Sequence, residues 1–168
     1  PLMEQFMKFA DLDEETARLA VSYYRERYST IGIFENRVYP GIEEMLRELR
    51  KKGYLLAVAS SKPEKFVLQI LEHFHLLGYF HEVVGSEMNG NRTNKSAVVE
   101  EALKRLGLSD KRESVLMVGD KEHDVLGARA CGIECLAVSY GYGTMEELQA
   151  AQPLKIAASA GEILDFFA

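Results

Sequence analysis

From residue 40 onward, helix-like and strand-like patterns alternate along the chain. Segments with apolar residues three and four positions apart, as in amphipathic helices, alternate with short apolar runs that are typical of buried strands. The helix patterns cover residues 41–52, 63–75, 95–106, 122–131 and 160–167, and the strand patterns cover residues 54–59, 82–85, 114–118 and 133–138. Strands that alternate with helices form βαβ units, so we predict an α/β fold, a Rossmann-like parallel sheet with helices on both faces.

The residues before this alternation form a different kind of segment. Residues 13–29 have the pattern of one amphipathic helix, which Asp13 is expected to cap, and residues 30–39 have the composition of a linker. We therefore expect a small helical part to precede the α/β part.

Charge and cysteine content argue against several classes of protein. The 168 residues include 20 Lys and Arg against 26 Asp and Glu, a net charge of −6, whereas nucleic-acid-binding proteins need basic surfaces. The two cysteines, Cys131 and Cys135, have no Cys or His neighbour at metal-ligand spacing. No apolar stretch has the length of a membrane span. We expect a cytoplasmic protein whose partners are neither nucleic acid nor membrane.

Polar side chains of complementary kinds follow three of the predicted strands. Ser60 and Ser61 come directly after strand 54–59, and Lys95 opens the helix that follows the next strand. Asp120 follows strand 114–118, and Asp124 comes one helical turn later. Because ligands of open α/β sheets bind at the carboxyl ends of the strands, we expect these five side chains to converge at one edge.

Each of these residues also has a plainer role when it is taken alone. Hydroxyls and carboxylates are favoured helix caps, and a lysine in a first helical turn can simply be solvated. The combination is more specific, because hydroxyl, ammonium and backbone N–H groups bind an oxyanion while carboxylates suit Mg²⁺. We therefore predict a site for a phosphate group and Mg²⁺, built from Ser60, Ser61, Lys95, Asp120 and Asp124.

Four segments together resemble the haloacid dehalogenase-like (HAD) hydrolase superfamily, in its phosphoglycolate phosphatase-like and 5′-nucleotidase-like branch. They are VYPGIEEMLRELRKKGYLLAVASSKP, NRTNK, VLMVGDKEHDVLGARACG and VSYGYGTMEEL. The resemblance implies a Mg²⁺-dependent phosphatase that hydrolyses small phosphomonoesters, that is, small phosphorylated metabolites, through an aspartyl-phosphate intermediate. One departure is the stretch Lys121-Glu122-His123, where many relatives carry Ser-x-Asn, and it leaves the branch and the substrate open.

The resemblance also implies a role for each candidate residue. Ser60 corresponds to the motif that hydrogen-bonds the transferred phosphoryl group, with Ser61 beside it. Lys95 corresponds to the lysine that neutralises the phosphoryl oxygens. Asp120 and Asp124 correspond to the acids that hold Mg²⁺, and Asp124 alternatively positions Lys95.

The nucleophile that such enzymes require is not found in the sequence. They carry Asp-x-Asp-x-Thr after an apolar first strand, whereas Asp11 and Asp13 follow EQFMKFA, which is helix-like, and precede Glu14 and Glu15. Helix capping accounts for this acidic pair better than catalysis does.

By the resemblance, residues 1–37 are the C-terminal part of a helical cap domain, and residues 38–168 are a HAD hydrolase core that lacks its first strand. We therefore expect an N-terminal segment to supply the nucleophile and the central strand between strands 54–59 and 114–118. Without that segment the chain is expected to be inactive and not to fold stably as a native monomer, because the edges of both strands would be unpaired.

The sequence leaves other functions open. The substrate could be phosphoglycolate, or a nucleotide if the protein is a 5′-nucleotidase of the same superfamily. The chain could instead be a non-catalytic binding fragment, since it lacks the nucleophile. A receiver-type phosphoacceptor domain is disfavoured, because its acids would cluster on the earliest strands.

Overall fold

The computed structural model describes residues 2–87 and 91–168, so Pro1, where the first predicted domain begins, lies outside the described residues. The described chain divides into two compact units, Pro1–Arg37 and Val38–Ala168. This division falls at the boundary expected from the sequence, while the assignment of the first unit as part of a cap stays a prediction. No helix in the described parts of the chain is both long and apolar enough to cross a membrane.

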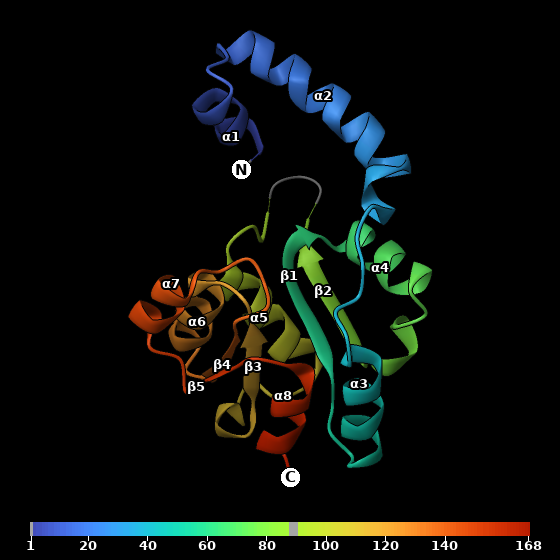
Figure 1. Ribbon diagram of the computed structural model, residues 1–168, viewed down its shortest axis with the longest axis vertical. Coiled ribbons are helices and arrows are strands. Elements are labelled where there is room, and N and C mark those ends of the chain that lie inside the picture. The colour runs from blue at the N-terminus through green and yellow to red at the C-terminus, as the bar shows by residue number, and fades with distance from the viewer. Residues whose placement is uncertain (1, 88–90) are drawn as a thin grey trace. The chain divides into compact units, whose positions relative to one another are not determined.

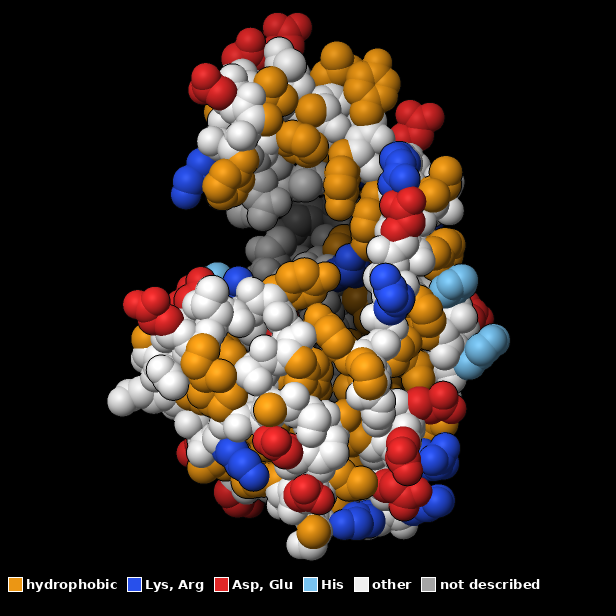
Figure 2. All heavy atoms as spheres, viewed as in Figure 1, with side chains coloured by type: hydrophobic (Ala, Val, Ile, Leu, Met, Phe, Trp, Pro, Cys, Tyr) orange, Lys and Arg blue, Asp and Glu red, His pale blue; other side chains and the backbone are white. Residues whose placement is uncertain are grey.

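The first unit is helical and buries few of its side chains. It contains α1 (Leu2–Phe9), α2 (Glu14–Thr30) and the 3₁₀ turn η1 (Gly32–Phe34). Asp13 caps α2 as predicted, because its carboxylate accepts a hydrogen bond from the Thr16 N–H at 2.8 Å. Large apolar side chains remain exposed along this unit, where hydrophobic side chains gather in Figure 2. They include Met7, Phe9, Leu19, Tyr23, Tyr24 and Ile31.

The second unit alternates strands and helices, as the sequence predicts (Figure 1). Its strands are β1 (Ala57–Pro63), β2 (Glu82–Ser86), β3 (Leu116–Gly119), β4 (Glu134–Val138) and β5 (Lys155–Ala157). Its helices are α3 (Ile42–Lys51), α4 (Glu64–His73), α5 (Lys95–Arg105), α6 (Glu122–Ala130), α7 (Met145–Ala151) and α8 (Ala160–Phe166), with the 3₁₀ turns η2 (Leu77–Tyr79) and η3 (Arg112–Ser114).

The described strands are all parallel and form two sheets. β1 pairs with β2, and β4 lies between β3 and β5. No backbone pairing joins β1 to β3 among the described residues, so each of these two strands has one edge without a strand partner. The predicted parallel α/β fold is confirmed, and the sheet is divided between β1 and β3, where the resemblance implies a further strand.

Strand β4 supplies side chains to two hydrophobic cores. Cys135 and Ala137 pack with residues of α5, α6 and α7, whereas Leu136 and Val138 pack with residues of α3 and α8. Successive side chains of a strand point to opposite faces, so this division places one helix layer on each face of the sheet.

Several elements differ from the sequence-based expectation, among them the predicted linker 30–39, which contains η1 with the buried Ile33. β1 begins at Ala57 instead of residue 54, because its backbone pairing with β2 begins at Ala57, opposite Glu82; Tyr54 and Leu55 are exposed, and the Tyr54 ring packs on Phe167. The strand also extends through Ser60 to Pro63. α7 is absent from the predicted helices, although Thr144 and Glu147 form the capping box that marks its start. β5 has three residues, too few for a periodic pattern.

Candidate active site

Lys95 lies in the first turn of α5 and bridges strand β1 and helix α6. Asn94 caps this helix by accepting a hydrogen bond from the Ala97 N–H at 2.8 Å. The Lys95 Nζ donates to the backbone oxygen of Ala59 on β1 at 3.0 Å and forms an ion pair with Asp124 Oδ1 at 2.8 Å. A cation opposes the dipole at the start of a helix, and the Asp124 carboxylate compensates for this conflict.

Asp124 is buried and uses both of its carboxylate oxygens. Oδ1 pairs with Lys95, while Oδ2 accepts hydrogen bonds from the N–H groups of Asp120 and Lys121, each at 3.0 Å. Asp124 therefore links Lys95 to the backbone that carries Asp120. This geometry matches the predicted role of positioning Lys95, and the role of Asp124 as a metal ligand stays a prediction.

Asp120 is half-buried at the end of β3. Its Oδ2 accepts a hydrogen bond from the Tyr142 N–H at 2.7 Å. Within the part of the chain that the structure describes, no hydrogen bond is found to Oδ1, so one oxygen is available to a ligand. Lys95, Asp120 and Asp124 thus form a connected group beside Ala59 of β1 and the carboxyl end of β3, and their roles in a phosphate and Mg²⁺ site stay a prediction.

The two serines lie beside this group without bonding to it. Ser60 follows Ala59 on β1, and its Oγ accepts a hydrogen bond from the Lys62 N–H at 3.1 Å. Ser61 is exposed. No hydrogen bond joins either hydroxyl to Lys95 or Asp124 among residues 2–87 and 91–168. Their predicted role in phosphate binding depends on a ligand and stays a prediction.

Asp120 and Asp124 suit Mg²⁺ better than they suit a metal ion that takes all of its ligands from protein side chains. In the described residues, no group of three or more His, Cys, Asp and Glu side chains is placed to hold a metal ion. Mg²⁺ usually keeps several waters and binds one or two carboxylates together with substrate phosphate. Asp120, with an available oxygen on an otherwise fixed carboxylate, is compatible with that kind of site.

Two glycines allow the charged groups to approach each other. A Cβ atom on Gly119 would lie 2.3 Å from the Cβ of Asp124, and one on Gly127 would lie 2.5 Å from the Cγ of Lys95. Gly127 is not among the site residues predicted from the sequence. The sequence does hint at its role, because Gly127 lies inside a predicted helix, where glycine costs about 1 kcal/mol relative to alanine. A glycine at such a position suggests that a neighbouring group packs closely against the helix.

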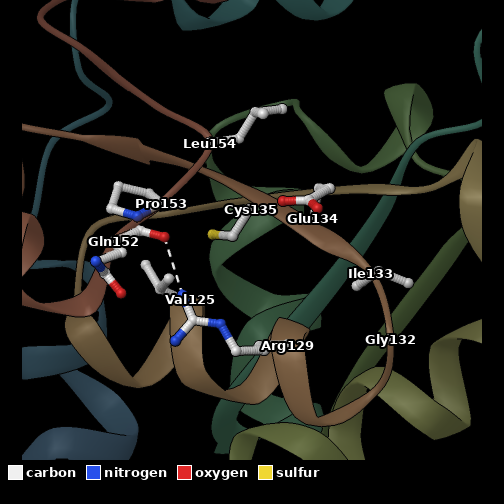
Figure 3. Close-up of a pocket in the computed structure, with 9 residues that line it drawn as sticks. All are labelled: Val125, Arg129, Gly132, Ile133, Glu134, Cys135, Gln152, Pro153 and Leu154. Carbon is white, nitrogen blue, oxygen red and sulfur yellow. Dashed lines mark hydrogen bonds between the residues drawn. The ribbon is translucent and has the colours of Figure 1, made fainter.

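A separate cavity of about 240 Å³ lies near the amino end of β4 (Figure 3). Arg129 lines it and donates hydrogen bonds to the backbone oxygens of Ala151 and Gln152. Cys135 also lines it, and burial, with a smaller contribution from the negative charge of Asp124, raises the pKa of this thiol to about 12. None of the predicted site residues lines this cavity, and Arg129 already has protein partners, so we do not assign it to the active site.

The chain is similar to proteins of one family. A family model described as haloacid dehalogenase-like hydrolase matches residues 1–138. A 5′-nucleotidase of Pseudomonas aeruginosa is 43% identical over 153 residues, which are 91% of this chain and 68% of that protein. A phosphoglycolate phosphatase of Aliivibrio fischeri is 30% identical over 90% of this chain and 66% of that protein.

Two further similarities extend the comparison. The tyrosine-protein kinase PtkA of Mycobacterium tuberculosis is 38% identical over 85% of this chain, which spans 48% of the length of PtkA. The crystal structure of a predicted phosphatase from Clostridium acetobutylicum superposes with a TM-score of 0.90 at 41% identity, over 99% of this chain and 76% of that chain. The chain therefore spans between about half and about three quarters of the length of these proteins.

Proposed function

Because the chain belongs to the haloacid dehalogenase-like hydrolase family, we propose that the whole protein is a Mg²⁺-dependent phosphatase acting on small phosphomonoesters through an aspartyl-phosphate intermediate. The observation that carries this proposal is the connected group of Lys95, Asp124 and Asp120. A largely buried ammonium and an available carboxylate oxygen lie by the carboxyl end of β3, and α/β proteins bind their ligands at the carboxyl ends of parallel strands.

In this proposal each residue acts on the phosphate or on the metal. Lys95 neutralises charge on the phosphoryl oxygens, and Ser60 and Ser61 orient them. Asp120 holds Mg²⁺, and Asp124 contributes to that site while it holds Lys95 in place. Bound Mg²⁺ would supply charge stabilisation at the phosphoryl group.

We further propose that the nucleophilic Asp comes from a strand that pairs with β1 and β3. Both strands have one edge without a described partner. Both are also only partly buried, whereas four of the five residues in each of β2 and β4 are buried. The central strands of an α/β sheet are normally its most buried strands. The partial burial of β1 and β3 therefore supports an additional strand that lies between these two.

Two substrate classes follow from the relatives. The phosphoglycolate phosphatase of A. fischeri suggests 2-phosphoglycolate, and the 5′-nucleotidase of P. aeruginosa suggests a nucleoside 5′-monophosphate. The higher identity to the nucleotidase, 43% against 30%, favours testing nucleotides alongside phosphoglycolate.

The test uses the full-length protein, including any residues that precede Pro1. Phosphate release from 2-phosphoglycolate, nucleoside monophosphates and pyrophosphate is measured with Mg²⁺ and with EDTA. We expect Mg²⁺-dependent release from at least one phosphomonoester and its loss in Asp120→Ala, with Gly78→Ala as the control because nothing lies within 4 Å of the position of its added Cβ. Near-normal hydrolysis by Asp120→Ala would contradict the proposal, and an inactive wild type that still binds phosphate would favour the non-catalytic alternative.

A further inference from the structure

The loop of residues 140–143 contacts Asp120 through its backbone. The Tyr142 N–H donates to Asp120 Oδ2 at 2.7 Å, and the Gly143 N–H donates to the backbone oxygen of Asp120 at 3.0 Å. The Tyr142 side chain is 85% exposed, so this residue reaches the site through its N–H group and not through its ring.

Glycine at positions 141 and 143 permits a close approach to Asp120. A Cβ on Gly141 would lie 2.2 Å from the Cβ of Asp120 and 2.4 Å from its Oδ2, and a Cβ on Gly143 would lie 2.2 Å from the Asp120 backbone oxygen. Neither glycine has a positive φ, so backbone conformation does not require it. The loop therefore packs against Asp120 more tightly than any other residue type would allow.

Both ends of the loop are fixed to the second unit. The Tyr140 ring packs edge-to-face on Tyr39, with ring centroids 5.0 Å apart. At the other end, Thr144 begins α7: its Oγ1 accepts a hydrogen bond from the Glu147 N–H at 3.2 Å, and Glu147 Oε2 accepts one from the Thr144 N–H at 2.9 Å. A loop anchored at both ends can hold the group that it contacts in one orientation.

We propose that residues 140–143 form a positioning clamp for Asp120. The clamp occupies Oδ2 through the Tyr142 N–H, so that Oδ1 is the oxygen available to Mg²⁺. This inference rests on the proposed function, because it assigns Asp120 to the cation. Groups that orient a metal ligand typically change metal affinity or activity by about 10- to 100-fold when they are removed.

The test measures Mg²⁺ binding directly, by isothermal titration calorimetry on the full-length protein. One variant replaces Tyr142 by its α-hydroxy acid analogue, which exchanges the N–H donor for an ester oxygen and keeps the side chain. The second variant is Gly141→Ala, and Gly78→Ala is the control, since Gly78 is also without a positive φ but has open space around its Cβ position. Thermal unfolding and steady-state kinetics are recorded for each protein.

We expect the ester variant and Gly141→Ala to bind Mg²⁺ about 10- to 100-fold more weakly than the wild type, with a matching rise in the Mg²⁺ concentration needed for activity. We expect Gly78→Ala to bind like the wild type. Because the ester adds no atom that could clash, it decides the result if Gly141→Ala does not fold. An ester variant with wild-type Mg²⁺ affinity would overturn the clamp alone, whereas a wild type that binds no Mg²⁺ would overturn the proposed function as well.

Discussion

Removing the Asp124 carboxylate should destabilise the protein strongly, because it leaves the largely buried Lys95 ammonium without its charged partner. The Lys95–Asp124 pair has an N–O distance of 2.8 Å, and the two side chains are 16% and 8% exposed. Breaking a buried ion pair by removing one partner costs about 3–5 kcal/mol. Asp124→Ala also removes the acceptor of the Asp120 and Lys121 N–H groups, whereas Lys95 keeps the Ala59 backbone oxygen as an acceptor, so we place the loss near the middle of that range, at about 4 kcal/mol.

The assay is urea unfolding of the full-length protein, followed by circular dichroism. With a denaturant slope of about 2 kcal/mol/M, a loss of about 4 kcal/mol lowers the urea midpoint by about 2 M. Lys51→Met is the matched control, because the Lys51–Glu48 pair has a similar N–O distance of 2.7 Å but side chains that are 63% and 35% exposed. An exposed pair of this kind contributes at most about 1 kcal/mol.

A double-mutant cycle separates the pair from the rest of the site. Lys95→Met removes the charge that Asp124→Ala leaves unpaired, so the double variant should be more stable than Asp124→Ala alone. The reasoning is refuted if Asp124→Ala costs no more than Lys51→Met, or if the effects of the two site mutations are simply additive.

Three further predictions concern positions around the site. Replacing glycine by alanine inside a helix normally raises the free energy of unfolding by roughly 1 kcal/mol, but Gly127→Ala should not, because its Cβ would displace Lys95. We also expect kcat/KM to fall about tenfold, and a higher urea midpoint with unchanged kinetics would contradict this prediction. Asn94→Ala should cost about 1 kcal/mol in urea unfolding through loss of the cap. Burial raises the pKa of Cys131 to about 11 and of Cys135 to about 12. Iodoacetamide at pH 8 should therefore label these thiols only after denaturation, and rapid labelling of the native protein would contradict their burial in this fold.

The sequence predicts the helices and the longer strands well because their patterns are local. Glycines 53, 107 and 132 follow helices and adopt positive φ, as helix C-termini favour. Strands β2 and β4 are buried on both faces, so their residues form continuous apolar runs. β5 contains only Lys155–Ala157, and a strand of that length is defined by its pairing with β4, which the sequence does not display.

The candidate site is predicted in part for a related reason. Lys95, Asp120 and Asp124 follow strands, and parallel topology brings strand ends together wherever the strands are predicted correctly. The contact from the Tyr142 N–H to Asp120 is different, because every residue except proline carries a backbone N–H and the type of residue 142 carries no signal for it. Only the glycines on either side of Tyr142 hint at such an approach, and glycines are equally common in loops where they simply form a turn.

Strand β4 has a consequence for how the protein can be altered. Each of its residues from Cys135 to Val138 fills space in one of the two helix layers, so none of these four side chains can be enlarged without displacing a neighbour or shortened without leaving a void. Sequence variation that retunes the enzyme is therefore best accommodated in the connections that leave the carboxyl ends of the strands, while the middle of the sheet must stay nearly constant in volume.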